Sequence, residues 1–291
     1  MNDQRPNLDP HPDPTRKHDF VFLFDVRDGN PNGDPDAGGM PRIDPVTMQG
    51  IVTDVAIKRK LRNAVTLISE GRPGYEIYVE EGVALNAQHE RAYTDGSATT
   101  ERDAKTWMQE NFFDVRMFGA VMTTGNQDRK AGRARGPIQL TFSRSIDPVT
   151  PLEAAITRVT KTRQDAIDAG KETEMGSKHY IPYGLYRGEG YFSAPIATKA
   201  GVTTEDLQTF WRAFTLMFEH DRASGRGAMA LRGLYVFTHD DAYGKAPAHK
   251  LLERIQVRPL SHREARNFAE YTVTVDESPL PDGVTLTPVV L

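Results

Sequence analysis

The chain has 291 residues, a formal net charge of −4 and no cysteine. This length suffices for a core without disulfides, and we expect one elaborated domain. The lack of cysteine excludes thiol nucleophiles and thiolate zinc sites, and it fits a reducing cytoplasm. The apolar runs fall far below the roughly 20 residues that span a bilayer, and the first residues lack a signal-peptide pattern. We therefore expect a soluble cytoplasmic protein with no membrane partner.

The acidic balance argues against indiscriminate binding to nucleic acid, which usually accompanies a basic domain. It still permits a local basic groove, because charges are screened over roughly 8 Å at physiological salt. Acidic residues on the far side of the domain then weaken such a groove little.

Residues 1–18 are rich in Pro, Asp and Asn and predict a disordered tail. A strand follows at residues 19–26. Both alternating sets of its side chains are mostly apolar, which predicts a central strand covered on both faces. Its aromatic residues could stack on nucleobases, as in RNA-binding sheets, but we favour core packing.

The loop at residues 27–50 is rich in Asp, Asn, Gly and Pro. Its start resembles a calcium-binding EF-hand loop, but the twelfth position is Gly39 where a Glu belongs. Two interpretations of its acids stay open: a divalent metal site for phosphodiester cleavage, or turn formation, which we favour. The acids are Asp25, Asp28, Asp34 and Asp36.

A helix is predicted from residue 51 onward, because apolar residues recur at three- and four-residue spacing. They are Ile57, Leu61, Ala64, Val65 and Ile68. Lys58, Arg59 and Arg62 then point away from this stripe, with Thr53 near the amino-terminal end. No acid at i+4 pairs with them, so they form either a phosphate-binding face or an ordinary solvated one.

A second basic cluster precedes the strand at residues 138–145, with four cations within seven residues. They are Arg129, Lys130, Arg133 and Arg135. Glycine lets a backbone approach phosphate closely and arginine binds phosphate bidentately, so this segment is a phosphate-binding candidate. The alternative is a flexible solvated loop.

Residues 152–196 predict a long excursion between strands, returning as an aromatic strand. Pro182 and Gly184 within that strand predict a bulge or an edge. A hairpin of this length cannot bury its own faces, so it should project and pack on a partner. A helix then begins at Thr203, with Asp206 completing a capping box. Its buried stripe is Leu207, Phe210, Trp211, Phe214, Met217 and Phe218.

The predicted order of strand, helix, strand, hairpin, helix, strand is that of an α+β, ferredoxin-like or RNA-recognition-like domain with large insertions. The segment FDVRDGNPNGDPDAGGMPRIDP followed by GIVTDVAIKRKLRN closely resembles a known family. This is the Cas-seven family of the Csd-two type, the repeated backbone subunit of type I-C CRISPR Cascade interference complexes. The segments DVRMFGAVM, GPIQLTFSRS and GSKHYIPYGLYRGEGYFSA are similar to the same family.

The resemblance covers about residues 19–240 and implies a hand-shaped protein. An RNA-recognition-like palm would span 19–278, with fingers at about 66–112 and a thumb hairpin at about 152–182. Independently of the resemblance, the prolines of residues 279–291 predict a C-terminal tail that could lie on a neighbour. Copies of it would polymerise along CRISPR guide RNA and display the guide for pairing with target DNA in antiviral defence. The implied partners include the Cas-five type, large and small subunits.

The resemblance also implies RNA-binding residues on the first helix and the thumb, and no cofactor, metal or catalytic site. The residues so implied are Arg42, Thr53, Lys58, Arg59, Arg62, Lys161, Arg163 and Lys178. The nuclease of type I systems is a separate, recruited protein, so we expect a binding protein. Related type III subunits cut RNA with an acid in the loop after the first strand. The alternative is therefore a metal-dependent endoribonuclease that uses Asp25, Asp28 or Asp34.

Overall fold

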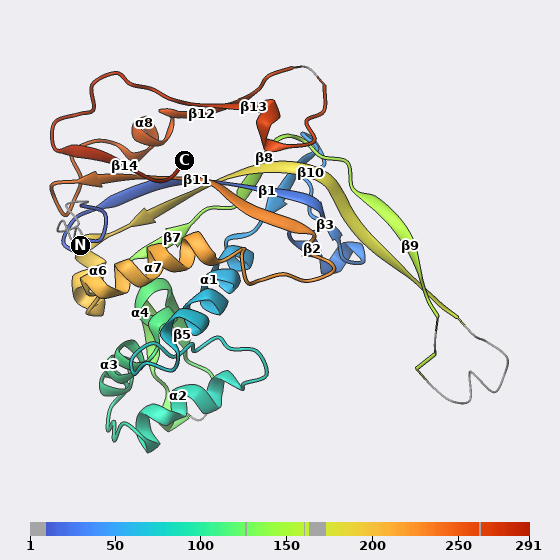
Figure 1. Cartoon of the computed structure of the whole chain (residues 1–291). Coiled ribbons are helices and arrows are strands. Elements are labelled where there is room, and N and C mark those ends of the chain that lie inside the picture. The colour runs from blue at the N-terminus through green and yellow to red at the C-terminus, as the bar shows by residue number, and fades with distance from the viewer. Residues whose placement is uncertain (1–9, 126, 160, 163–172, 262) are drawn as a thin grey trace, which may run out of the picture.

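The computed structural model describes residues 10–125, 127–159, 161–162, 173–261 and 263–291. Its centre is a mixed α/β arrangement around one large antiparallel sheet (Figure 1). The strands of this sheet are β1 (His18–Gly29), β4 (Gln49–Val52), β8 (Ser143–Pro148), β10 (Glu174–Phe192), β11 (Ala228–His239) and β14 (Val284–Val290). They lie in the order β14-β11-β1-β10-β8-β4, and β7 (Ile138–Leu140) and β9 (Leu152–Arg158) pair with β10 off this path.

The strand β1 lies at the middle of the sheet, antiparallel to β10 on one side and β11 on the other. Phe20, Phe22 and Phe24 point into one hydrophobic core, and Val21 and Leu23 into the other. All five side chains are fully buried. The prediction of a central strand covered on both faces, with aromatics in the core, is confirmed.

Two glycines of β10 explain how these phenylalanines fit against the neighbouring strand. Phe22 lies opposite Gly188, and Phe20 lies opposite Gly190. A Cβ atom at either glycine would lie 2.2 or 2.1 Å from the facing ring, closer than any real contact. The glycines therefore make room for the rings.

Helices cover the first face of the sheet: α1 (Asp54–Ser69), α6 (Ala194–Ala200) and α7 (Thr204–Leu216). The predicted stripe of α1 is in the core, with Ile68 partly buried. The capping box at Thr203 and Asp206 and the whole predicted stripe of α7 are present. Both helices are thus confirmed, and Phe210, Trp211 and Phe214 pack edge-on against Phe20.

Residues 70–136 form a helical insertion below α1 with a small core of its own. Its elements are α2 (Leu85–Thr94), α3 (Glu101–Asn111), α4 (Phe113–Phe118), β5 (Gly119–Met122), η2 (Gln127–Arg129) and β6 (Gly132–Arg135). The expected boundary at residue 112 is too early, because Met122 and Ala131 of the β5–β6 hairpin complete this core.

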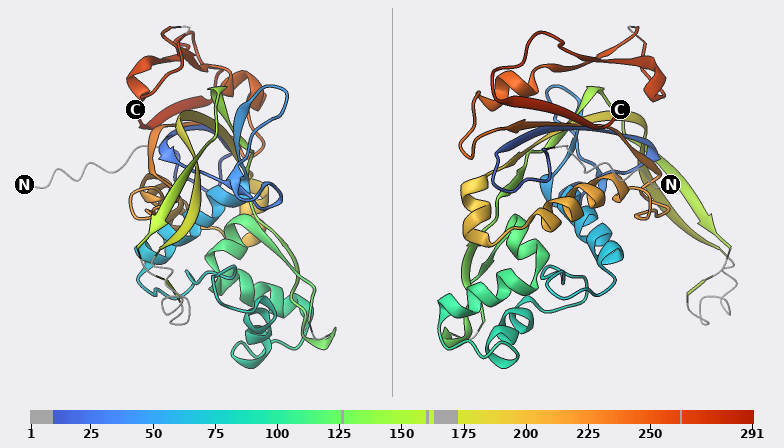
Figure 2. Two further views of the ribbon diagram at one scale, coloured as in Figure 1. Left: turned by 90° about the vertical axis from the view of Figure 1, so that its right-hand side faces the viewer. Right: turned by 60° about the vertical axis from the view of Figure 1, so that its left-hand side comes forward.

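The second face of the sheet is covered by a C-terminal layer, seen on the upper side in both views of Figure 2. It consists of α8 (Ala248–Leu252), β12 (Ile255–Pro259), η3 (Phe268–Glu270) and β13 (Tyr271–Val275). β12 and β13 form a two-stranded sheet, and their buried residues join Val21 and Leu23 in the second core.

A two-stranded ribbon projects from the sheet (Figures 1 and 2). It is formed by β9 and the first part of β10, paired from Leu152 with Tyr180 to Arg158 with Glu174. We call residues 152–158 and 174–180 the hairpin arm. Among described residues, positions 181 and 183–185 of β10 pair with β1 alone and position 182 has no partner in the register, so the strand has a local edge there. Pro182, which has no N–H to donate, lies at this edge as predicted.

Both predicted tails need correction. Residues 1–9 lie outside the described residues, but residues 10–18 pack on the fold: His18 is fully buried in β1, and the carbonyl of His11 accepts a hydrogen bond from Trp211. The segment at 279–291 is not a tail on a neighbour, because β14 is the edge strand beside β11. Its Pro288 misled the sequence interpretation, since proline is tolerated in an edge strand. No described helix is long and apolar enough to cross a membrane.

Candidate nucleic-acid interface

The loop between β1 and α1 is built by its own polar side chains. It contains β2 (Gly33–Asp34), η1 (Pro35–Ala37) and β3 (Met40–Pro41). Asn32 accepts hydrogen bonds from the amide and the hydroxyl of Thr53, at 3.0 and 2.9 Å. The Thr53 hydroxyl in turn caps α1 by accepting from the amide of Ala56. Arg42 lies 3.4 Å from Asp34. Thr53 therefore positions the helix, and Arg42 is partly neutralised.

The basic residues of α1 are not a free solvated face. Lys58 pairs at 2.9 Å with Asp54, four residues before it, where the sequence interpretation had looked only four residues after. Arg59 donates to the carbonyl of Val79 at 2.7 Å. The expectation that these cations lack partners is therefore wrong.

Arg62 is the clearest departure from that expectation. It is buried, and its Nε lies 2.7 Å from Asp114 of α4. Asp114 also accepts from the backbone amides of Tyr78 and Val79. A buried charge with such partners ties the helical insertion to α1. A second buried pair, Arg116 with Asp206 at 2.7 Å, ties the insertion to the amino-terminal end of α7.

The second predicted cluster lies on the β5–β6 hairpin of the insertion. Arg133 and Arg135 are exposed and alternate with Ala134, which packs toward the core of the insertion. The two arginines therefore share the outer face of β6. Among described residues, neither they nor the exposed Arg129 form an ion pair or side-chain hydrogen bond. Lys130 lies between them in sequence and has a partner.

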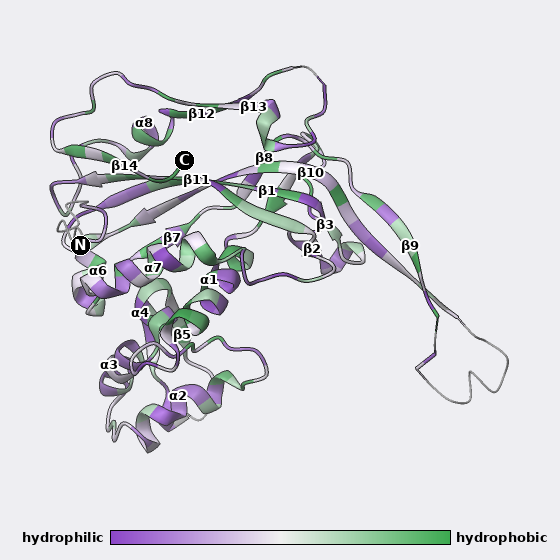
Figure 3. Cartoon of the chain, in the orientation of Figure 1, coloured by the Kyte–Doolittle hydropathy of each residue, from purple (hydrophilic) through white to green (hydrophobic). Residues whose placement is uncertain are grey.

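The hairpin arm carries Lys178 and, at the end of β9, Arg158, together with exposed apolar residues. Leu152, Ile156 and Lys178 lie on one face of the ribbon, because Lys178 is opposite Ala154 in the register. Leu152 is 40% exposed and Ile156 53% exposed. Figure 3 shows the resulting apolar stretches on β9. Lys161 is partly buried beyond the end of β9, and Arg163 lies outside the described residues.

Of the four acids at the end of β1 and in the loop after it, Asp28 and Asp36 are exposed and their side chains have no partner among described residues, and Asp28 has a positive φ of 50°. Asp25 is buried, accepts from the hydroxyl of Tyr183 at 3.0 Å, and lies 2.9 Å from Nε of Arg232. Asp34 caps η1 by accepting from the amide of Asp36. These contacts fit the interpretation of the acids as turn and framework residues.

Four arginines that the sequence did not single out gather around Asp25 in a pocket of about 160 Å³. They are Arg27, Arg222, Arg232 and Arg266, and we call this the arginine pocket. Burial, and then the charge of Asp25, raises the pKa of Tyr183, so that its hydroxyl stays protonated and donates to Asp25. The four arginines come from β1, the α7–β11 turn, β11 and the C-terminal layer, so no local pattern could reveal them.

Comparison with known proteins identifies the family. The fold defines a mixed α/β protein built on a large antiparallel sheet, and the family model for CRISPR-associated protein Cas7 matches residues 16–276. The chain therefore belongs to the Cas7 family. It is 27% identical over 224 residues to the CRISPR-associated protein Cas7 of Haloferax volcanii. That match covers 68% of this chain and spans 64% of the length of the relative.

Three solved structures are also similar to the chain, each over 76% of its length. A CRISPR RNA-guided surveillance complex in a pre-nicking state has a matching chain at TM-score 0.47 and 10% identity, covered to 78%. A chain of a second CRISPR RNA-guided surveillance complex matches with a TM-score of 0.45 and 11% sequence identity, and the match covers 68% of that chain. A chain of a type III-B Cmr-beta complex bound to cognate target RNA matches with a TM-score of 0.42 and 14% sequence identity, and the match covers 61% of that chain.

Proposed function

We propose that the chain is the repeated backbone subunit of a type I-C Cascade complex, of the Csd-two type. Copies of it polymerise along CRISPR guide RNA in the cytoplasm and display the guide for pairing with target DNA. The observation that carries the proposal is the family match, which takes in the hairpin arm, the three covering helices and every strand of the central sheet except β14. The Cas-five type, large and small subunits complete the assembly.

The palm of this subunit is RNA-recognition-like. The strand order β11-β1-β10-β8 supports this, with α1 following β1 and α7 following β10 in the chain. This is the order of a ferredoxin-like unit, with the helical insertion between α1 and the next strand. The hairpin arm extends β8 and β10 and serves as the thumb.

The guide backbone is held by cations that have no partner within the subunit. Arg129, Arg133 and Arg135 meet that condition among described residues, whereas Lys58, Arg59 and Arg62 are occupied. An arginine fork that is not already paired can bind phosphate bidentately at no cost to the fold. Lys178 adds a contact from the thumb, next to the apolar side chains that meet the neighbouring copy.

The RNA contact is tested by changing Arg129, Arg133 and Arg135 together to alanine. Binding of unrelated single-stranded RNAs should weaken alike, and the salt slope should become less negative by about 2, because each lost phosphate contact removes about 0.7. Lys199, Arg212 and Lys250 are exposed on other elements and provide a control of equal charge. If both triple variants show the same salt slope of RNA binding, the helical insertion does not bind the guide-RNA backbone.

We also propose that the subunit is not an enzyme. Asp25 pairs with Arg232 and accepts a hydrogen bond from Tyr183, and Asp34 caps η1. Of the three candidate acids Asp25, Asp28 and Asp34, this leaves Asp28 without a side-chain partner among described residues. Incubation of the assembled protein with guide-paired RNA and Mn²⁺ should leave the RNA intact. Cleavage that disappears in Asp28→Ala would establish the endoribonuclease instead.

A further inference from the structure

The arginine pocket has a charge excess that the fold does not use. Its one lining carboxylate, Asp25, is already engaged by Tyr183 and Arg232. Arg27 is exposed and forms no ion pair with another described residue. Of the other three lining arginines, Arg27 therefore has no acidic partner among described residues, whereas Arg222 and Arg266 pair with glutamates that do not line this pocket.

The outer two of these arginines are held only loosely. Arg222 pairs with Glu219 at 3.1 Å and Arg266 with Glu264 at 2.7 Å, and in both pairs each side chain is at least half exposed. Ion pairs exposed to this degree contribute little to stability. Either arginine is therefore free to exchange its carboxylate for a stronger anion.

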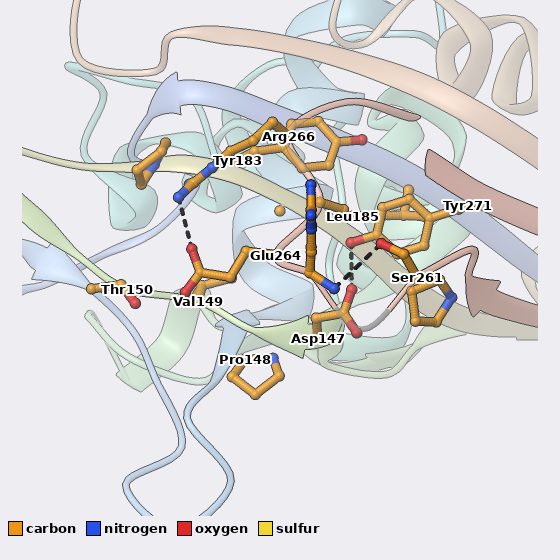
Figure 4. A pocket seen from close by; sticks show the side chains of 15 residues that line it. Asp147, Pro148, Val149, Thr150, Tyr183, Leu185, Ser261, Glu264, Arg266 and Tyr271 are labelled. Carbon is orange, nitrogen blue, oxygen red and sulfur yellow. Dashed lines mark hydrogen bonds and ion pairs between the residues drawn. The ribbon is translucent and has the colours of Figure 1, made fainter. Parts of the chain in front are cut away.

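A second, larger cavity of about 350 Å³, shown in Figure 4, adjoins the arginine pocket. The two share Tyr183 and Arg266 in their walls. The cavity lies beside positions 182–185 of β10, the local edge where that strand changes partner. We call it the tyrosine cavity, after Tyr183 and Tyr271.

The walls of the tyrosine cavity combine apolar and hydrogen-bonding groups. Prolines, Val149 and Leu185 provide the apolar part, and Asp147 accepts a hydrogen bond from the hydroxyl of Tyr271 at 2.6 Å. Burial, and then Asp147, raises the pKa of Tyr271, which keeps this hydroxyl a donor. A cavity of this size with a few placed polar groups is typical of sites for small organic groups.

We propose that these two adjoining cavities hold one nucleotide of a single nucleic-acid strand. Its phosphate lies among Arg27, Arg222 and Arg266, and its sugar and base enter the tyrosine cavity. The arginines supply the charge and forked geometry that a phosphate requires. The assignment to a strand rests on the proposed function, whereas the assignment to a nucleotide rests on the paired cavities alone.

The test uses the full chain and a double change, Arg27→Ala with Arg266→Ala. Both side chains are exposed and lie outside the buried Asp25 pair, so the fold should be unaffected. Binding of AMP, of inorganic phosphate and of a short unstructured oligoribonucleotide is measured by calorimetry. AMP should bind more tightly than inorganic phosphate, and the double change should weaken AMP and oligonucleotide by about tenfold or more.

Two matched variants distinguish a built site from general charge. Arg212→Ala with Lys250→Ala removes the same charge elsewhere and should leave AMP binding unchanged. Arg27→Lys with Arg266→Lys keeps the charge but loses the fork, and should give intermediate AMP affinity. Equal AMP binding in the alanine and control variants, or no binding of AMP to the unmodified chain, would overturn the nucleotide site.

The oligonucleotide arm separates this inference from the proposed function. RNA binding that is lost in the double alanine variant and kept in the control supports a strand in the pocket. Loss of AMP binding alone would contradict the assignment to a strand and leave a site for free nucleotides. If the unmodified chain binds AMP but no RNA, the proposed function fails while the nucleotide site stands.

Discussion

At the scale of single residues, the main lesson comes from the basic face of α1. The spacing of its apolar residues correctly predicted the helix and its buried stripe, because that pattern is local. The partners of its cations were not predictable in the same way. Arg62 meets an aspartate 52 positions away, and Arg59 meets the carbonyl of Val79. The basic residues of α1 were therefore interpreted as a free surface, although they form ion pairs and hydrogen bonds within the subunit.

Arg62→Ala should destabilise the fold by about 3 kcal/mol, because it leaves the buried Asp114 without its counterion. Urea denaturation measures the loss. The exposed Arg212→Ala is the control, with an expected change within about 0.5 kcal/mol. Equal stability of the two variants would show that Arg62 is not a structural residue.

His18 should make the free energy of unfolding decrease at acidic pH. Burial lowers its pKa from 6.5 to about 4 in the folded chain. Its Nε2–H donates to the carbonyl of Asp13, so Nδ1 accepts from the hydroxyl of Thr238. Between pH 6.5 and 4 the unfolded chain binds a proton at this position that the folded chain does not. Stability is therefore full above pH 6.5 and falls as the pH drops, by on the order of 3 kcal/mol in total.

The measurement is urea denaturation at pH 7 and pH 5 in the unmodified chain and in His18→Gln, which keeps a donor but does not titrate. The difference between the two pH values should be smaller in the variant. If the stability difference between pH 7 and pH 5 is the same in both proteins, groups other than His18 cause the loss of stability at acidic pH.

At the scale of elements, the hairpin arm was predicted correctly from the sequence, whereas the strand β14 was not. The arm was predicted to project because a long ribbon cannot bury both faces, and it does. β14 was missed because its proline suggests an interrupted tail, although an edge strand accommodates it beside β11. Strand pairing is a long-range property, so composition alone could not assign β14 to its place.

The apolar face of the arm should matter for assembly and not for folding. Leu152→Ser with Ile156→Ser changes two exposed side chains on one face, so the free energy of unfolding should change by less than about 0.5 kcal/mol. Association of copies on a long RNA, followed by sedimentation, should be strongly reduced. Tyr243→Ser with Leu260→Ser changes two apolar residues elsewhere that are even more exposed, and this variant should sediment as the unmodified chain does. If the two double variants sediment alike, the hairpin arm does not take part in the contact between neighbouring copies.

At the scale of the whole molecule, the order of elements was predictable and the convergence of distant residues was not. The sequence motifs indicated a member of the Cas7 family, and the match of that family model over residues 16–276 confirms this membership. The arginine pocket draws on four separate segments, so it exists only after the sheet and the C-terminal layer have met. The same holds for the two buried pairs that orient the helical insertion.

Weak contacts in each subunit can still give a stable particle when many subunits share one strand. A few phosphate contacts per copy give a shallow salt slope and weak binding of one subunit. Neighbours on the same RNA raise the effective concentration of each next copy. A single subunit should therefore bind RNA poorly and an array should bind it well.

The central claim, that copies assemble along RNA, is tested most directly by sedimentation of the purified protein before and after exhaustive ribonuclease treatment, with the 260/280 absorbance ratio recorded in each fraction. We expect large particles with nucleic-acid absorbance that collapse to monomers once the RNA is digested. Large particles that survive digestion with the absorbance of protein alone would contradict the account.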